Sequence, residues 1–102
     1  MSEASIRQDE PGVLALVGVL DYSTGPALRQ QGRVLIGAAE AKDLVLDCAG
    51  VEKSSSVGPS LLLAYLRDAK AAGKRLRIRA LPQDMREIAQ VCGLLELLPL
   101  DA

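Results

Sequence analysis

The apolar residues of this chain fall into short runs, and the spacing within each run predicts the element that it forms. Residues 13–20 (VLALVGVL) are almost continuously apolar and rich in valine, which favours a buried strand over a helix. Residues 44–48 (LVLDC) and 76–81 are predicted as further strands, and residues 5–9 as an edge strand. Residues 49–56 are predicted to form a loop.

Helical spacing lies between these strands. Pro26 fits the first turn of a helix that runs to about residue 40. Gly32 and Gly37 weaken this helix by up to about 1 kcal/mol each relative to Ala, so tertiary packing must hold it. Four of its residues are expected to be buried: Leu28, Leu35, Ala38 and Ala39.

The clearest helical pattern covers residues 59–72 and ends at Gly73. Its core-facing stripe is expected to contain Leu61, Leu62, Tyr65, Leu66 and Ala69. A second stripe on the other side contains Ser56, Ser60, Leu63, Arg67, Lys70 and Lys74. This second stripe is either a solvated face with one exposed leucine or a compact docking surface beside the serines that precede the helix.

The last part of the chain predicts one more helix, from Pro82 to Cys92, ended by Gly93. A leucine-rich tail follows and is expected to cap the core through Leu94, Leu95, Leu97, Leu98 and Leu100. The order of elements is strand, helix, strand, helix, strand, helix. Such alternation predicts an α/β sandwich in which the strands that bracket each helix are parallel.

One predicted strand indicates where the helices lie. Arg75, Arg77 and Arg79 alternate with Leu76, Ile78 and Ala80. Alternation of this kind gives a strand one buried and one wet face. We therefore expect a mixed, mostly parallel central sheet with helices mainly on one face and part of the other face open.

The composition excludes several classes of function. The 102 residues are 49% hydrophobic and 25% charged with a net charge of −1, which is typical of one globular domain and unlike a polyanion binder. There is no His, Trp or Phe, so Ser-His-Asp catalysis, Cys-His catalysis and His-based metal sites are excluded. Only two tyrosines offer a base-stacking surface, which argues against nucleic-acid binding. We expect no cofactor, metal or small-molecule substrate.

The chain also has no apolar run of the roughly 20 residues that span a bilayer, and its start lacks the pattern of a signal peptide. A cytoplasmic location without direct membrane insertion is expected. Cys48 and Cys92 are therefore expected to be reduced, and their apolar neighbours predict that both are buried.

Three adjacent serines, residues 54–56, join a strand to the helix of residues 59–72. One interpretation is that Ser56 caps the helix, which stabilises it by about 1 kcal/mol. With Ser56 as the cap, Pro59 is the third residue of the helix and has no amide hydrogen to donate. The free amides at the start of the helix are then those of Val57 and Gly58. The other interpretation is a site that binds an anion or an acidic partner, since helix N-termini suit negative charge.

Two further sets of charged residues are candidates for function. Asp21 and Asp47 are both predicted at strand ends, where α/β folds place ligand sites, but no phosphate-binding loop accompanies them, so loop and cap roles are favoured. A basic set is a candidate surface for an acidic partner, or simply the wet face of a strand: Lys74, Arg75, Arg77 and Arg79.

The sequence resembles a STAS domain, the fold of bacterial anti-sigma-factor antagonists and of sulfate-transporter tails. The resemblance rests on VLALVGVLD, on the helix that follows it, and on KDLVLDCAGVEKSSSVGPSLLLAYLRDAKAAGKRLRIRAL, and it predicts a single STAS domain over residues 1–102. In that family the motif Asp-Ser/Thr-Ser/Gly-Gly joins the third strand to the second helix, and its Ser or Thr is the phosphorylated or partner-reading position. Ser55 stands at the Asp, Ser56 at the Ser/Thr and Gly58 at the Gly, with Pro59 an unusual successor.

Small free-standing members of this style are similar to the STAS subunits of phospholipid ABC transporters in Gram-negative bacteria. The resemblance implies a non-enzymatic cytoplasmic subunit that binds the transporter's ATPase subunit, and through it the permease, by the second helix and the preceding loop. The residues it implies for partner binding are Ser55, Ser56, Gly58, Ser60, Leu63 and Arg67.

Two other functions stay open. One is an anti-sigma-factor antagonist phosphorylated at Ser56 in a partner-switching pathway, for which the missing acid at Ser55 is a departure. The other is a small nucleotide-binding or hydrolytic protein that uses Asp21 and Asp47, against which the lack of a phosphate loop counts.

Overall fold

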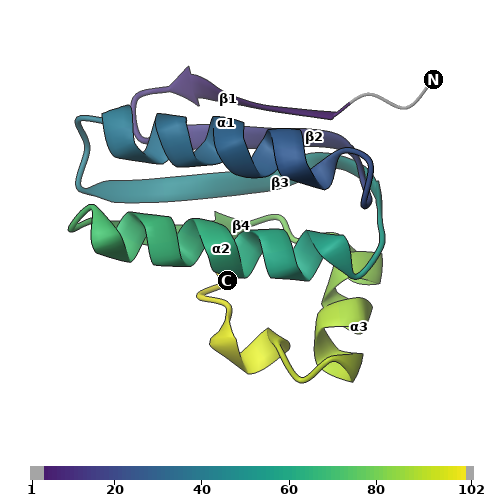
Figure 1. Cartoon of the computed structure of the whole chain (residues 1–102). Helices are drawn as coiled ribbons and strands as arrows, with labels where there is room; N and C mark the ends of the chain where they lie inside the picture. Colours follow the sequence, from purple (N-terminus) through teal and green to yellow (C-terminus); the bar gives the residue numbers. More distant parts are fainter. Residues whose placement is uncertain (1–3, 101–102) are drawn as a thin grey trace.

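A computed structural model describes residues 4–100 of the chain as a four-stranded sheet with two long helices in front of it (Figure 1). The elements are β1 (Ala4–Glu10), β2 (Val13–Leu20), α1 (Gly25–Ala38), β3 (Asp43–Ser54), α2 (Val57–Ala71), β4 (Arg75–Arg79), α3 (Gln83–Val91) and the 3-10 helix η1 (Leu95–Leu97). Their order and number agree with the prediction from the apolar pattern. Among the described residues, no helix is long and apolar enough to span a bilayer.

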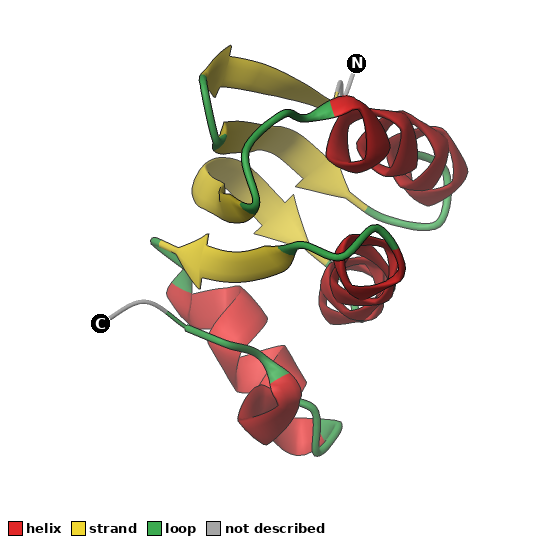
Figure 2. Cartoon of the chain, turned by 90° about the vertical axis from the view of Figure 1, so that its left-hand side faces the viewer, coloured by secondary structure: helices red, strands yellow, loops and turns green. Residues whose placement is uncertain are grey.

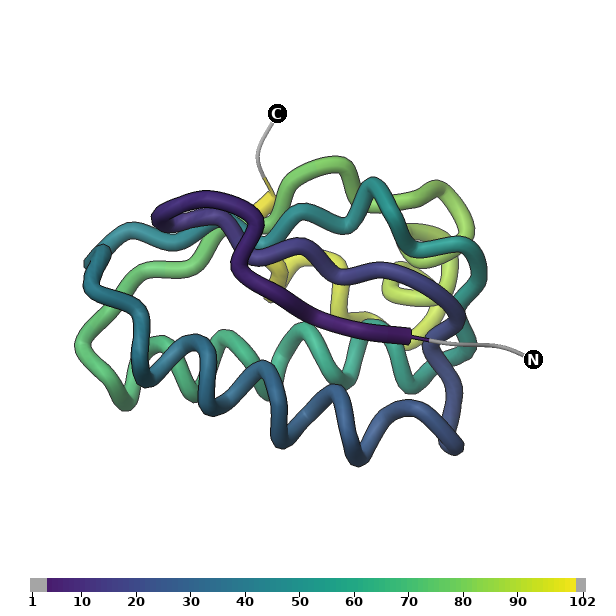
Figure 3. The backbone as a smooth tube through the Cα atoms, turned by 90° about the horizontal axis from the view of Figure 1, so that it is seen from above, coloured from purple at the N-terminus to yellow at the C-terminus, as the bar shows by residue number. Residues whose placement is uncertain are grey.

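The sheet has the order β1-β2-β3-β4, with β1 antiparallel to β2 and the other two pairings parallel. Each parallel pair brackets a helix, β2-α1-β3 and β3-α2-β4, as the alternation of elements predicts. Both helices lie on one face of the sheet, while α3 lies beyond the β4 edge (Figure 2). Seen from above, the strands and the pair α1 and α2 form two layers (Figure 3). The expected mixed, mostly parallel sheet with one open face is confirmed.

The predicted loop over residues 49–56 is wrong for its first six residues, because β3 continues to Ser54. The pairing with β2 shifts register twice, and β3 carries one extra residue at each shift. Such bulges let a strand continue through a sequence that looks like a turn. Gly50 makes this close pairing with β2 feasible, since a Cβ there would lie 2.2 Å from Cγ1 of Val17.

The buried face of α1 differs from the predicted one. Leu28 is buried as expected, but Ala38 is exposed, and the second large buried residue is Ile36. Gly32 lies between them at the point where α1 crosses Tyr65 of α2. A Cβ on Gly32 would lie 2.1 Å from Cε1 of Tyr65, so this glycine is needed for packing rather than merely tolerated.

The core-facing stripe of α2 is confirmed, with Leu66 only half-buried and the rest buried: Leu61, Leu62, Tyr65 and Ala69. The leucine-rich tail caps the core in part. Leu98 is buried, and the amide of Ile78 donates to the carbonyl of Pro99 (2.9 Å), so the tail pairs with β4, but Leu97 is exposed. Cys48 is buried as predicted, whereas the prediction for Cys92 is wrong, because it lies on the exposed end of α3.

Candidate functional site

The three serines between β3 and α2 have three different environments. Ser54 ends β3 and is buried, and its hydroxyl donates to the carbonyl of Ser55 (2.7 Å). The amide of Ser55 donates to the carbonyl of Leu20 at the end of β2 (2.9 Å), which ties the junction to the sheet. Ser54 is therefore part of the framework, and Ser55 and Ser56 are exposed beside it.

Gly58 allows the first turn of α2 to sit on this framework. A Cβ at Gly58 would lie 2.0 Å from Oγ of Ser54 and 3.0 Å from Cε of Met85 in α3. Gly58 is buried, so its side of the helix faces β3 and α3 rather than solvent. Its predicted place in the partner-binding set is thus an indirect one, because it positions the exposed residues next to it.

The first amides of α2 are satisfied by Ser55, and not by Ser56 as the capping interpretation predicts. The amide of Val57 donates to Oγ of Ser55 (3.2 Å), and the amide of Gly58 donates to the carbonyl of Ser55 (3.0 Å). The prediction that these two amides are free is wrong, which removes the donors that an anion site would need. Ser56 precedes the helix without a side-chain capping bond, and its exposed hydroxyl has no hydrogen bond within residues 4–100.

The outer face of α2 presents four of the predicted residues, which we call the docking strip: Ser56, Ser60, Leu63 and Arg67. Ser56, Ser60 and Arg67 are exposed, while Leu63 is half-buried against the core. Lys74 does not belong to this face. Its Nζ donates to three carbonyls at the end of α1, those of Ile36 (2.5 Å), Gly37 (3.1 Å) and Ala39 (2.7 Å), so it holds α1 to α2.

A groove of about 450 Å³ between the first turns of α1 and α2 borders this strip. Its lining is mainly apolar and comprises Tyr22, Gly25, Pro26, Arg29, Ser56, Val57, Ser60, Leu61 and Ala64. Sequence reasoning missed the half that comes from α1, because the helical period places residues on a face but does not say which helix lies beside it. The one sequence signal for it is Tyr22, an aromatic residue in the polar segment before a helix that begins with Gly25-Pro26.

Asp21 and Asp47 lie too far apart to act together. Asp21 follows β2 and accepts hydrogen bonds from the hydroxyl (2.6 Å) and amide (2.9 Å) of Ser23 and from the amide of Thr24 (3.1 Å), which lower the pKa of its carboxyl. Asp47 lies in the middle of β3 rather than at its end, on the order of 20 Å from Asp21 along the strand. Asp21 has the loop role that the sequence favoured, but its side chain does not cap α1.

On the open face of the sheet, the predicted basic set is partly neutralised. Arg75 pairs with Asp43 and Arg79 with Asp47, each at 3.0 Å. The amide of Ala49 and then the Arg79 guanidinium hold the pKa of Asp47 below its usual value. This face of the sheet is solvent-exposed and carries its own ion pairs, as the second interpretation of the basic set predicts. Lys74 does not lie on it, because its Nζ binds the end of α1.

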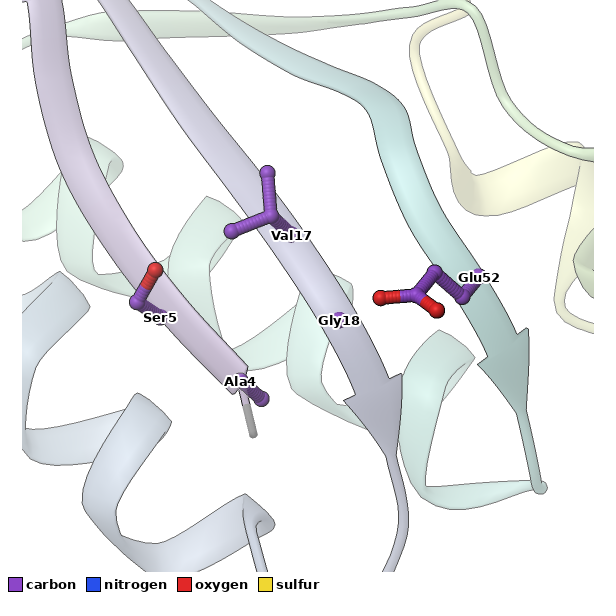
Figure 4. Close-up of a pocket in the computed structure, with 5 residues that line it drawn as sticks. All are labelled: Ala4, Ser5, Val17, Gly18 and Glu52. Atoms are coloured by element: carbon purple, nitrogen blue, oxygen red, sulfur yellow. The ribbon is translucent and has the colours of Figure 1, made fainter. Parts of the chain in front are cut away.

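A second hollow, of about 460 Å³, lies on the same open face (Figure 4). Val17 and Gly18 of β2 form its middle, with Ala4 and Ser5 of β1 on one side and Glu52 of β3 on the other. It offers one carboxylate and one hydroxyl. No group of three or more His, Cys, Asp or Glu residues able to hold a metal ion occurs among residues 4–100.

Comparison with known proteins assigns the family. Residues 4–99 match the sequence model of a family described as "Mlab, STAS domain". The chain belongs to the STAS domain family. At the junction of β3 and α2, the Ser55 hydroxyl accepts a hydrogen bond from the amide of Val57, at the position where the resemblance predicts the Asp of the family motif.

The STAS fold of this chain recurs in solved structures, of which three are compared below. A chain of the Acinetobacter MlaFEDB complex in an ATP-bound conformation has a TM-score of 0.79 at 23% identity, over 94% of this chain and 98% of that one. An anti-sigma factor antagonist from Mycobacterium paratuberculosis has a TM-score of 0.75 at 25% identity, over 98% and 85%. The phosphorylated Bacillus cell fate determinant SpoIIAA has a TM-score of 0.65 at 17% identity, over 98% and 92%. The same fold therefore serves a transporter complex and anti-sigma factor antagonists.

Proposed function

We propose that this STAS domain is a non-enzymatic subunit that binds the ATPase of a phospholipid-transport ABC system and regulates or stabilises it. The observation that carries the proposal is the docking strip on α2, in which the Ser56 hydroxyl is exposed and makes no hydrogen bond within residues 4–100. The family match described as "Mlab, STAS domain" and the fold shared with a chain of a MlaFEDB complex support this choice of partner.

The chemistry of the surface favours binding over catalysis. The two carboxylates that were candidates for acid-base work are far apart and engaged in local hydrogen bonds or an ion pair. The docking strip combines two small hydroxyls, one half-buried leucine and the cation Arg67, and arginine is enriched where one protein packs against another. Through the ATPase, the subunit would be linked to the permease and held at the cytoplasmic side of the inner membrane.

The test is co-purification with the ATPase–permease complex of the lipid-transport system from the same genome. Ser56→Arg and Leu63→Asp are each expected to weaken binding about tenfold or more, because they place bulk or charge in the centre of the interface. Gln90→Arg on α3 and Val34→Asp on the outer side of α1 make the same kinds of change at exposed positions elsewhere.

Both control variants are expected to bind as the wild type does. Circular dichroism and thermal unfolding check that every variant is folded, which matters most for half-buried Leu63. Undiminished binding by folded Ser56→Arg and Leu63→Asp would sink the proposal.

A second candidate function rests on the same exposed hydroxyl. Ser56 is accessible to a kinase, and the phosphorylated Bacillus SpoIIAA shares the fold. A phosphoryl group there would add close to two negative charges on the docking strip and would disrupt or remake an interface. Intact-mass measurement after incubation with anti-sigma-factor kinases of the same genome tests this alternative: an added phosphoryl group that Ser56→Ala abolishes supports it, and unchanged mass excludes those kinases.

A further inference from the structure

One wall of the groove between α1 and α2 is an aromatic side chain that is almost fully exposed to solvent. Tyr22, in the turn before α1, is 85% exposed, while the only other aromatic residue of the chain, Tyr65, is fully buried. Pro26 lies beside Tyr22, and Leu61 and Ala64 of α2 face them across the groove. Aromatic rings at the edge of an apolar groove are the residues that contribute most when a partner covers them.

The groove is held in shape before any partner arrives. The hydroxyl of Tyr65 donates to the carbonyl of Leu28 (2.6 Å) beneath the contact of the two helices. At the far end of the groove, Arg29 of α1 makes a bidentate ion pair with Asp68 of α2. A preformed groove avoids the entropy of ordering two helices on binding.

The charge beside the groove selects the partner's chemistry. Arg67 and Lys70 on the outer face of α2 are exposed and have no ion-pair partner within residues 4–100. Asp68, the one acidic residue of α2, is engaged by Arg29 of α1 and does not neutralise them. Arg67 lies seven residues, or roughly 10 Å, along the helix from Ser60 at the rim of the groove.

We propose that this groove receives two apolar side chains, one helical turn apart, from an amphipathic helix of the ATPase subunit, and that an acidic residue about two turns away on that helix pairs with Arg67. The inference rests on the proposed function and extends it, because it adds the α1 side of the surface and Tyr22 to the docking strip. Ser56 and Ser60 belong to both, so the groove and the strip form one continuous surface. Recognition of a helix by its apolar face and one flanking charge is a common binding mode.

The test measures the dissociation constant of the purified domain for the ATPase–permease complex prepared without it. Tyr22→Ala is expected to weaken binding about tenfold or more, since it removes an aromatic wall, whereas Tyr22→Phe keeps most of the affinity. Ala64→Phe fills the groove and is expected to weaken binding to a similar degree. Val91→Ala, at an apolar residue that is 88% exposed on α3, is the matched control and leaves binding unchanged. Tyr22 is so exposed that its truncation leaves the domain folded, and this variant decides the matter if Ala64→Phe does not fold.

The outcomes separate the groove from the docking strip. If Ser56→Arg weakens binding but Tyr22→Ala and folded Ala64→Phe stay within about twofold of the wild type, the proposed function stands and the groove proposal is overturned. If none of the three weakens binding, the proposed function fails with it. If Tyr22→Ala instead converts a dimer to a monomer in sedimentation equilibrium with no change in ATPase binding, a second copy of this chain fills the groove, which also overturns the proposal. Arg67→Met is expected to reduce the salt dependence of binding, and an unchanged salt dependence contradicts the acidic contact.

Discussion

Replacement of Gly32 by alanine sets the helix propensity of α1 against its packing on Tyr65 of α2. In an isolated helix, Gly→Ala is stabilising by up to about 1 kcal/mol, because alanine has less backbone entropy to lose. In this protein the added Cβ would lie 2.1 Å from Cε1 and 2.6 Å from Cζ of Tyr65. Real Cβ atoms do not approach another carbon so closely, so the ring or the helix must move.

The magnitude follows from what Tyr65 does at this contact. Its ring is fully buried, and overpacking of a well-packed core costs about 1–3 kcal/mol. Its hydroxyl donates to the carbonyl of Leu28 at 2.6 Å, and a buried hydroxyl that loses its partner costs about 1–3 kcal/mol more. After the gain in helix propensity is deducted, Gly32→Ala is expected to lower the free energy of unfolding by about 1–5 kcal/mol.

Gly37 of the same helix provides the matched control, since a Cβ there meets nothing within 4 Å. Gly37→Ala is expected to raise the free energy of unfolding by a few tenths to about 1 kcal/mol. Urea unfolding followed by circular dichroism measures both variants, with equal m-values required for the comparison. In a double variant, Gly32→Ala with Tyr65→Leu, the loss should be smaller than the sum of the two single losses, because leucine lacks the ring edge that meets the Cβ. If Gly32→Ala unfolds at the same or a higher urea concentration than the wild type, the reasoning about this contact is refuted.

Two further predictions concern the thiols and one carboxyl group. Cys92 is exposed and Cys48 is buried, and burial and then the charge of Asp47 raise the pKa of the Cys48 thiol to about 12. Iodoacetamide should therefore label one cysteine of the native protein and two of the unfolded protein, as measured by intact mass. Rapid labelling of both cysteines in the native protein would contradict the burial of Cys48. Asp47→Asn is expected to destabilise the protein at pH 7 with a penalty that shrinks below about pH 4, because the fold lowers the pKa of Asp47 through the amide of Ala49 and through Arg79. The ionised carboxylate stabilises the fold above the unfolded pKa and loses that effect as the pH falls through the folded pKa, so urea unfolding that gives the same penalty at pH 7 and pH 3 would count against this role.

At the junction of β3 and α2, the capping interpretation assigned the cap to the wrong serine. Ser56 was the predicted cap, but its exposed hydroxyl makes no capping bond. The cap itself comes from Ser55, and Ser54 is a buried support for Gly58. Three adjacent serines have equal capping propensity, so only the angle at which β3 enters α2 distinguishes them.

The error at the end of β3 has a similar origin. Ala49 and Gly50 have weak strand propensity, and a local reading therefore ends the strand at Cys48. Pairing with β2 outweighs that preference, because two bulges and the missing side chain of Gly50 let the ladder continue to Ser54. The junction that carries the candidate site consequently starts from a buried strand end and not from a loop.

The sequence by itself determined the order of the elements, the core-facing stripe of α2, the open face of the sheet and the segment that holds Ser56. These are local properties, since a period of two or of 3.6 residues is visible within ten or fifteen positions. The groove was decided only by tertiary structure, because its walls come from α1 and α2 and the bond that sets their approach joins Tyr65 to Leu28, 37 residues away. Gly32 shows the reason most directly. It lowers the stability of α1 as an isolated helix, yet its missing side chain lets α1 pack against Tyr65 of α2. The local sequence shows the first effect and contains no sign of the second.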